Sequence, residues 1–263
     1  MNNRFGAGRL TVVIVAAAIA SAIVASPVAR AQQKYTPART MHGHPDFQGF
    51  WQVLNTAAWD IQDHGASLGV PAGLGIVVGN ELPYQPWALA KKHGNFKNRA
   101  TLDPETKCNM PGVPRITYMP YPFQIVQSSS HVAIFYEYIH VQRLIYTNGT
   151  RHPDAEMKAW MGDSRGHWEG DTLVVDVTNF EDKTWLDRAG NFHSDAMHVV
   201  ERYTRTGPDH MLYEATIEDP KVFTRPWKMS MPLYRRQEPN AQLLEYECYA
   251  YQTMEQGPQF RRE

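Results

Sequence analysis

The clearest local pattern in this chain is WMGDSRGHWEGDTLVVDVTNFEDKTWLDRAGNFHSDAMHVVERY, residues 160–203. Gly170-Asp171 separates two strand-like runs. In the second run one set of side chains alternates with another: Leu173, Val175 and Val177 with Val174, Asp176 and Thr178. A loop over residues 181–194 follows, and residues 196–205 then alternate again. A period of two is typical of strands that bury one face, so this stretch predicts a β-rich fold.

The rest of the chain has the same β character. We expect a turn into a first strand in residues 46–53, with Trp51 facing inward, and further strands at 123–127, 132–140, 142–147, 167–169, 172–178, 196–205, 211–218, 227–236 and 243–251. Asn148-Gly149 and Gly207-Pro208-Asp209 are turn signals between them. Short strands with regular turns indicate a barrel or sandwich, and we predict a single all-β domain over residues 32–263, an antiparallel barrel.

Three segments outside the predicted strands have their own patterns. Residues 86–93 predict a short helix that caps the barrel, because Pro86 suits the first helical position. Residues 56–79 are rich in Gly and lack periodicity, which predicts a long surface loop. Residues 101–122 are rich in Pro and predict an extended segment that packs over the core.

Residues 1–31 have the pattern of a secretory signal peptide. Arg4 and Arg9 precede an apolar run over residues 10–24, and Ala29-Arg30-Ala31 places small residues at a cleavage site. An uncleaved membrane anchor is the alternative, but the run is short for a span of about 20 residues. We therefore expect a periplasmic or secreted protein without a stable membrane span after cleavage.

The charge balance argues against a nucleic-acid partner. The chain has 26 Lys and Arg against 27 Asp and Glu, and three of the arginines precede residue 32. The mature chain therefore has 23 basic against 27 acidic residues, a net charge of −4. A protein that neutralises phosphates needs a basic surface, so we expect no nucleic acid among the partners.

The chain has two cysteines, Cys108 and Cys248. An exported chain meets oxidising conditions, in which the two form one disulfide bond. Two unpaired buried thiols are the alternative. The two cysteines lie far apart in the sequence and do not form a zinc signature.

Two acidic residues interrupt apolar strand faces, Glu137 and Glu201. A buried carboxylate is costly unless it is paired or hydrogen-bonded. One interpretation is a buried ion pair with Arg143 or Arg202, which are natural partners for a carboxylate. The other is a polar group in an apolar cavity, where such an acid orients a ligand or transfers a proton.

The loop over residues 181–194 joins two predicted strands, at a position where ligands enter barrels. It contains Trp185, Asp187 and His193. An aspartate that orients a histidine is a common acid–base arrangement, so Asp187 and His193 are candidate catalytic residues.

Histidines also raise the question of a metal site. His42 and His44 form a His-x-His pair, but metal sites need three or four converging ligands. A site made of His193, His198 and Glu201 would require a bulge, because His198 lies on the opposite strand face from Glu201. We therefore predict no metal. No phosphate-binding, dinucleotide-binding or haem-attachment motif is present in the sequence, and we predict no cofactor.

Several strings carry a resemblance to a known family: PYQPWALAKK at 83–92, DPETKCNMPGVPR at 103–115, PFQIVQ at 122–127, and residues 160–205. They resemble a large family of uncharacterised exported bacterial proteins with a lipocalin-like (calycin) barrel. The resemblance covers nearly the whole mature chain. It implies an exported β-barrel and brings no activity with it.

Three functions follow as hypotheses. The leading one is an exported barrel that binds a small apolar or aromatic molecule in a cavity with Gln124, Arg143, Glu137 and Glu201 as polar contacts. The other predicted ligand contacts are Tyr136, Trp185 in the loop at the barrel mouth, His152, which lies at the same mouth or in solvent, and His198. The second is a cofactor-independent lyase, isomerase or hydrolase in the same cavity, in which Asp187, His193 and a buried Glu act. The third is a structural envelope protein with a filled barrel.

Overall fold

The computed structural model describes residues 35–67 and 70–250. The predicted signal peptide and its cleavage site lie outside the described residues. Within these two ranges, no helix has the length and apolar character needed to cross a membrane.

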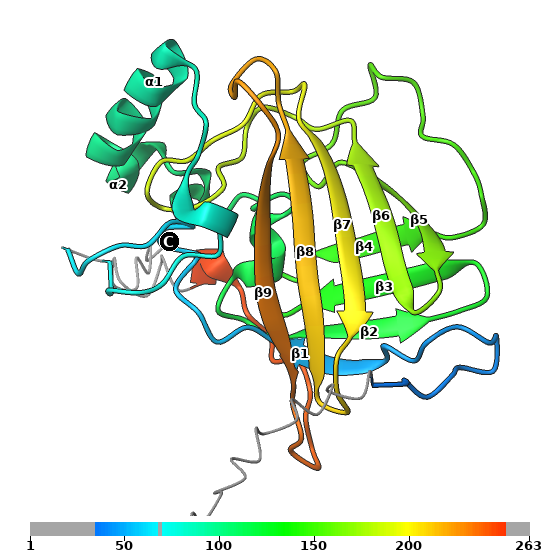
Figure 1. Cartoon of the computed structure of the whole chain (residues 1–263). Helices are drawn as coiled ribbons and strands as arrows, with labels where there is room; N and C mark the ends of the chain where they lie inside the picture. Colours follow the sequence, from blue (N-terminus) through cyan, green and yellow to red (C-terminus); the bar gives the residue numbers. More distant parts are fainter. Residues whose placement is uncertain (1–34, 68–69, 251–263) are drawn as a thin grey trace, which may run out of the picture. The chain divides into compact units, whose positions relative to one another are not determined.

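The described residues contain nine strands that close into one barrel in chain order (Figure 1). The strands are β1 Gly49–Gln52, β2 Phe123–Gln127, β3 His131–Tyr136, β4 Gln142–Tyr146, β5 Asp163–Glu169, β6 Thr172–Thr178, β7 His198–Arg205, β8 His210–Glu218 and β9 Trp227–Arg235. The barrel closes where β1 pairs with β9. The predicted all-β barrel is confirmed, and β2 and β6 have the predicted bounds.

One strand pair departs from the predicted antiparallel pattern. β4 and β5 run parallel, with Ile145 opposite Ser164, whereas the other pairs among the described strands are antiparallel. Parallel neighbours need a crossover of a dozen or more residues, and residues 147–162 supply it. Gly166 allows close packing at this pair, because a Cβ there would lie 2.8 Å from Ile145 Cγ2.

Three predicted strands are wrong in extent or existence. The strand predicted at 167–169 begins four residues earlier, at Asp163. Residues 132–140 stay extended only to Tyr136, since Ile139 and His140 take positive φ values of 43° and 53° and turn the chain. Residues 243–250 form no strand: Tyr246 makes a single bridge to Tyr138, and residues 248–250 are helical. Residue 251 lies outside the described range.

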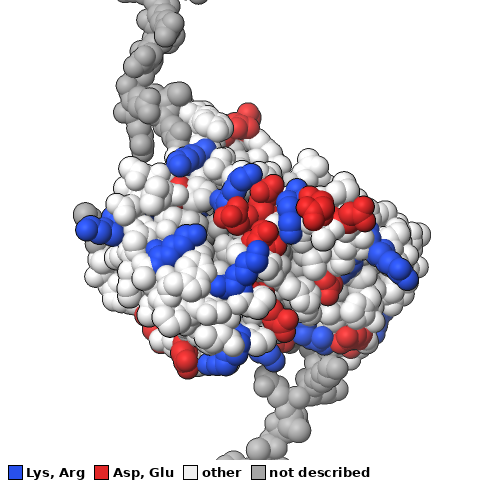
Figure 2. Space-filling model, turned by 90° about the horizontal axis from the view of Figure 1, so that it is seen from above, with Lys and Arg blue, Asp and Glu red and all other residues white. Residues whose placement is uncertain are grey.

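The strands alternate between a buried and an exposed face, as a closed barrel requires. In β7 every second residue from Val199 to Arg205 is buried, and β8 repeats the pattern from Met211 to Ile217. Trp51, the predicted inward anchor of β1, is fully buried. On the face seen in Figure 2, basic and acidic side chains are interspersed.

The helical elements lie to one side of the strands in Figure 1. They are α1 Pro86–Lys97, α2 Arg99–Leu102, and three short 3-10 turns: η1 Val78–Asn80, η2 Pro104–Lys107 and η3 Arg115–Tyr118. The predicted helix at 86–93 is confirmed and is one turn longer. It begins at Pro86, as expected.

Helix α1 packs on the loop over residues 181–194. Asn95 Nδ2 donates to the Gly190 carbonyl at 3.1 Å, and Lys91 Nζ lies 4.4 Å from the Phe192 ring centroid. Gly190 has φ +85°, and a Cβ there would lie 2.7 Å from the Phe96 nitrogen. A glycine is therefore required where this loop meets the helix.

The predicted disulfide between Cys108 and Cys248 is confirmed. It joins the end of η2 to the C-terminal segment across a sequence separation of 140. In the chain-entropy model, a cross-link over so long a loop restricts the unfolded chain strongly.

We expect the double variant Cys108→Ser, Cys248→Ser to lose about 2–5 kcal/mol of unfolding free energy. Urea unfolding of the variant and the oxidised wild type measures the difference. Reduced wild-type protein is the matched control and should unfold at the same urea concentration as the variant. Equal stability of all three forms would contradict a stabilising role for the disulfide.

Candidate functional site

The barrel interior contains a charged pair. The Arg143 guanidinium on β4 and the Glu201 carboxylate on β7 bind each other through two hydrogen bonds. Arg143 Nε also donates to Ser164 Oγ at 3.0 Å. The hydroxyls of Tyr203 and Tyr213 donate to Glu201 Oε1 at 3.1 and 2.9 Å. Glu201 is fully buried, and its charge is therefore balanced within the core.

This geometry supports the ion-pair interpretation of Glu201, with Arg143 as the partner. Burial is the largest single influence and lowers the pKa of Arg143. The charge and hydrogen bonds of Glu201, with Tyr203 and Tyr136, together outweigh burial and raise the pKa well above its ordinary value. Arg202, the other candidate partner, instead binds Glu169 at 2.9 Å on the outer face. The charges of Arg143 and Glu201 therefore neutralise each other, and the pair offers no unbalanced charge to a ligand inside the barrel.

Glu137 is buried at the end of β3, apart from the interior pair. Its Oε2 accepts a hydrogen bond from the Leu244 backbone amide at 2.8 Å. The prediction that Glu137 pairs with Arg143 or Arg202 is wrong, because its carboxylate instead binds a backbone amide of the C-terminal segment. Glu137 thereby fixes this segment beside the barrel.

The structure does not pair Asp187 with His193. Asp187 accepts hydrogen bonds from the Ile61 amide at 2.9 Å and from the amide and side chain of Asn191 at 3.1 and 2.5 Å. His193 contacts Thr184 Oγ1 at 2.5 Å and the Ser194 carbonyl at 2.9 Å. The predicted contact is wrong, because Asp187 closes a turn onto Asn191 and binds a second loop instead.

Both side chains are titratable groups in a fully buried setting. Burial is the main cause that raises the pKa of Asp187 to about 7, and the Asp60 charge is the second. The hydrogen bonds from Asn191 and Ile61 act in the opposite direction and lower the pKa. Burial lowers the pKa of His193. The hydrogen bonds of Asp187 join two loops, which is a structural role; catalytic roles for both residues remain predictions.

The other predicted ligand contacts lie in different places. Tyr136 is buried in the interior, as expected. Gln124 lies on the half-exposed outer face of β2, between the inward Phe123 and Ile125, so it does not line the interior. Trp185 is buried and borders a separate pocket of about 300 Å³ with Trp160.

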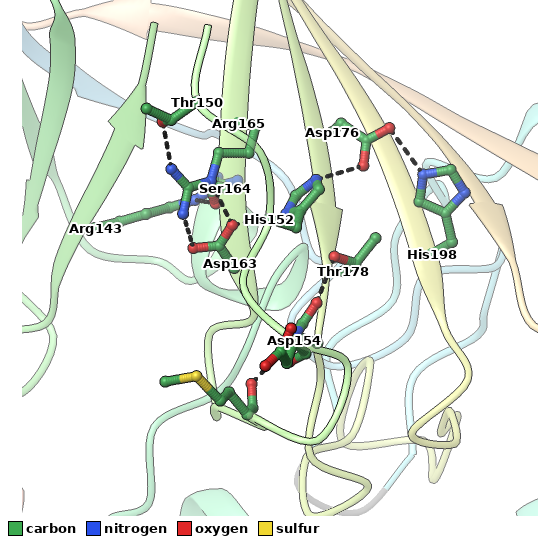
Figure 3. A network of polar contacts seen from close by, with 12 residues as sticks. Arg143, Thr150, His152, Asp154, Asp163, Ser164, Arg165, Asp176, Thr178 and His198 are labelled. Carbon is green, nitrogen blue, oxygen red and sulfur yellow. Dashed lines mark hydrogen bonds and ion pairs between the residues drawn. The ribbon is translucent and has the colours of Figure 1, made fainter. Parts of the chain in front are cut away.

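His152 and His198 lie on the outer wall, in the network of Figure 3. His152 Nδ1 lies 2.6 Å from Asp163 Oδ1, and His152 Nε2 lies 3.0 Å from Asp176 Oδ1. His198 Nε2 lies 3.1 Å from Asp176 Oδ2. Neither histidine lines the barrel interior, and their roles as ligand contacts stay predictions. The network fixes residues 147–162 to the wall. In the part of the chain that the structure describes, no three His, Cys, Asp or Glu side chains are arranged to hold a metal ion.

A pocket of about 550 Å³ lies beside the barrel. Its lining comes from the 56–79 loop, the α1–α2 junction, η2, the 181–194 loop, the turn after β3 and the C-terminal segment: Val70, Lys97, Arg99, Ala100, Asp103, Glu105, Thr106, Tyr138, Arg188, Tyr246 and Cys248. None of these residues belongs to a strand. Sequence analysis did not predict this pocket. It did predict the Cys108–Cys248 disulfide, which joins two of the lining segments, η2 and the C-terminal segment.

One wall of this pocket is aromatic. The rings of Tyr138 and Tyr246 stack with centroids 5.5 Å apart and planes at 26°. Tyr121 packs on Tyr246 at 4.7 Å. The Tyr138 hydroxyl is buried and has no hydrogen-bond partner within the described ranges. Tyr246, which is half-buried, therefore provides most of the accessible aromatic surface of this wall.

Another part of the lining is ionic. Arg115 is buried and binds both Asp103, at 3.0 Å, and Glu105, at 2.5 Å. Arg188 Nε and Nη2 also bind Glu105, at 2.8 and 2.5 Å. Burial alone would raise the pKa of Glu105, but the hydrogen bonds and charges of Arg188 and Arg115 lower it below the ordinary value. Glu105 is therefore ionised and fixed at neutral pH.

Comparison with known proteins gives one structural likeness. No protein-family model and no curated protein matches the chain. A solved structure similar to this chain is a mutant of the fluorescent protein UnaG, with 10% sequence identity and a TM-score of 0.33. The match covers 73% of this chain and 97% of that chain. The closed barrel described above is established by the strand pairing of this protein itself.

We expect Glu201→Gln to lower the unfolding free energy by about 3–5 kcal/mol, because it leaves the Arg143 charge buried without its partner. The double variant Arg143→Met, Glu201→Leu removes both charges and should be more stable than Glu201→Gln. Urea unfolding of the wild type, Glu201→Gln, the double variant and its two matching single variants, Arg143→Met and Glu201→Leu, gives the coupling energy. Additive effects would contradict the buried pair.

Asp187 should make stability depend on pH. Since its pKa in the folded protein is about 7, against an ordinary value of 3.8, the folded protein retains a proton that the unfolded chain loses within this window. Stability due to Asp187 therefore falls as pH rises from about 4 to about 7. Urea unfolding at several pH values should show that the unfolding free energy of Asp187→Asn increases relative to that of the wild type as pH rises. A pH-independent difference would contradict the raised pKa.

Proposed function

We propose that this protein is an exported barrel that binds a small molecule with an apolar or aromatic body. The observation that carries the proposal is the pocket of about 550 Å³ with its wall of Tyr138 and Tyr246. Ligand pockets typically measure about 300–1,000 Å³ and combine apolar walls with a few placed polar groups. This pocket has both.

The pocket replaces the barrel interior as the expected site. The interior charges of Arg143 and Glu201 satisfy each other, and large side chains such as Trp51, Tyr203 and Tyr213 are buried there. The pocket instead is lined by apolar side chains together with several charged groups. These groups support a ligand that lies beside the strands.

Export remains part of this proposal. The Cys108–Cys248 disulfide supports it, because disulfides persist in oxidising compartments and are rare in reducing ones. The signal-like pattern of residues 1–31 supports it independently. Binding without turnover accounts for the pocket more directly than catalysis, since Asp187 and His193 have separate partners and do not line it.

Native mass spectrometry of the protein purified from the periplasm tests this function. We expect an excess of a few hundred daltons that disappears on denaturation. Tyr246→Ala removes half of the aromatic wall and should lower ligand affinity roughly 10-fold or more, since stacked aromatic contacts contribute about 0.5–1.5 kcal/mol beyond the area they bury.

Tyr234→Ala is the matched control, because Tyr234 packs on His210 on β8, away from the pocket. It should retain the excess mass. Loss of the ligand in both variants, or retention in both, would contradict a site at Tyr246. A wild-type protein without excess mass, which also binds no aromatic probe, would overturn the proposal.

A further inference from the structure

We propose that a second pocket, the one bordered by Trp160 and Trp185, is a binding site for a neutral saccharide. This pocket measures about 300 Å³ and shares no lining residue with the pocket of the proposed function. The inference goes beyond that function, because it concerns a different ligand at a different place. Two features carry it: the pair of tryptophans, and a polar lining without net charge.

The two tryptophans are attached to backbone that hydrogen bonds hold in place. The carbonyl of Ala159, next to Trp160, accepts from the Glu181 amide at 3.0 Å. Trp185 forms a backbone bridge to Phe192 within the 181–194 loop. Both rings therefore border the pocket from preorganised positions, which lowers the entropy cost of binding a ligand between them.

Part of each indole is accessible from the pocket. Trp160 is half-buried, and Trp185 keeps 9% of its surface exposed. Neither indole N–H makes a hydrogen bond within residues 35–67 and 70–250. An indole combines an apolar face with an N–H donor. The C–H groups on one face of a pyranose ring pack on such an apolar face, and the sugar hydroxyls accept from such donors.

The polar part of the lining offers both donors and acceptors. Lys107 and Asn109 flank Cys108, and Asp182 comes from the 181–194 loop. The ammonium of Lys107 only donates, the carboxylate of Asp182 only accepts, and the amide of Asn109 does both. Lys107 and Asp182 have no ion-pair partner in the part of the chain that the structure describes. Hydroxyl groups donate and accept, so a ligand rich in them satisfies this mixture.

The charge balance favours a neutral ligand. Lys183, the other lysine of the lining, is neutralised by Glu181, whose Oε2 lies 3.0 Å from Lys183 Nζ. The remaining charges are the positive Lys107 and the negative Asp182, which cancel. An anionic ligand would therefore meet the Asp182 charge, and a cationic ligand the Lys107 charge. A hydrocarbon would desolvate both charges without offering either a partner.

Neutral methyl pyranosides of gluco, galacto and manno configuration, together with maltose, cellobiose and lactose, form the probe panel. Binding to the protein purified from the periplasm is measured by saturation-transfer NMR and titration calorimetry. We expect at least one member of the panel to bind, with an affinity that added salt changes by less than about 2-fold. The uronate and the amino sugar with the same ring configuration should bind no more tightly than the neutral sugar.

Trp160→Ala removes one ring of the site and should lower the affinity for that saccharide roughly 10-fold or more. Trp87→Ala is the matched control, because Trp87 is 52% exposed on α1 and does not line the pocket. It should leave the affinity unchanged. Lys107→Ala changes an exposed position and should lower the affinity several-fold at an unchanged melting temperature, so the test holds even if Trp160→Ala is unstable.

The outcomes separate this inference from the proposed function. Tyr246→Ala should leave saccharide affinity unchanged, and Trp160→Ala should retain the excess mass expected for the other pocket. Absence of binding by every neutral member of the panel would overturn the saccharide site. Equal effects of Trp160→Ala and Trp87→Ala would overturn its location. Tighter binding of the uronate or the amino sugar would overturn the neutral class.

Discussion

The fold depends on keeping two opposite charges together inside a barrel. Arg143 and Glu201 lie on β4 and β7, which are not neighbours in the strand order, and each needs the other because a single buried charge costs several kcal/mol. A slip of either strand by one residue would carry its charge to the outer face. The pair therefore fixes the register of two strands at once, and Ser164, Tyr203 and Tyr213 complete its hydrogen bonds.

The sequence predicts what depends on local periodicity, and it predicts little else. Alternation located β6 to the residue, and it marked Glu201 as a buried acid whose partner is Arg143. It did not find the parallel β4–β5 pair, since the crossover that reverses the chain has no periodic signal. It also mispaired Asp187 with His193, because closeness in the sequence does not determine which way two side chains turn within a loop.

The pocket shows why sites between loops escape local patterns. Its lining comes from six segments of the chain, and each contributes only one to a few residues. Tyr246 lies in a segment whose alternation predicts a strand, yet the residue belongs to a coil that Glu137 and the disulfide hold against the barrel. The strands supply a rigid frame, and the irregular segments fixed to that frame supply the chemistry.

The chain order of the barrel also has a consequence for how it forms. Each strand from β2 to β9 pairs with the strand next to it in the sequence, so the sheet can grow from one strand to the next by closing the loops between them. Three contacts do not fit this scheme: the pairing of β1 with β2, in which Gly49 lies opposite Ile125, the closure of β1 on β9, and the disulfide across a separation of 140 residues. Contacts so distant in sequence are slow to form. We expect an open sheet to precede the closed barrel, with the N-terminal strand and the C-terminal tether docking last.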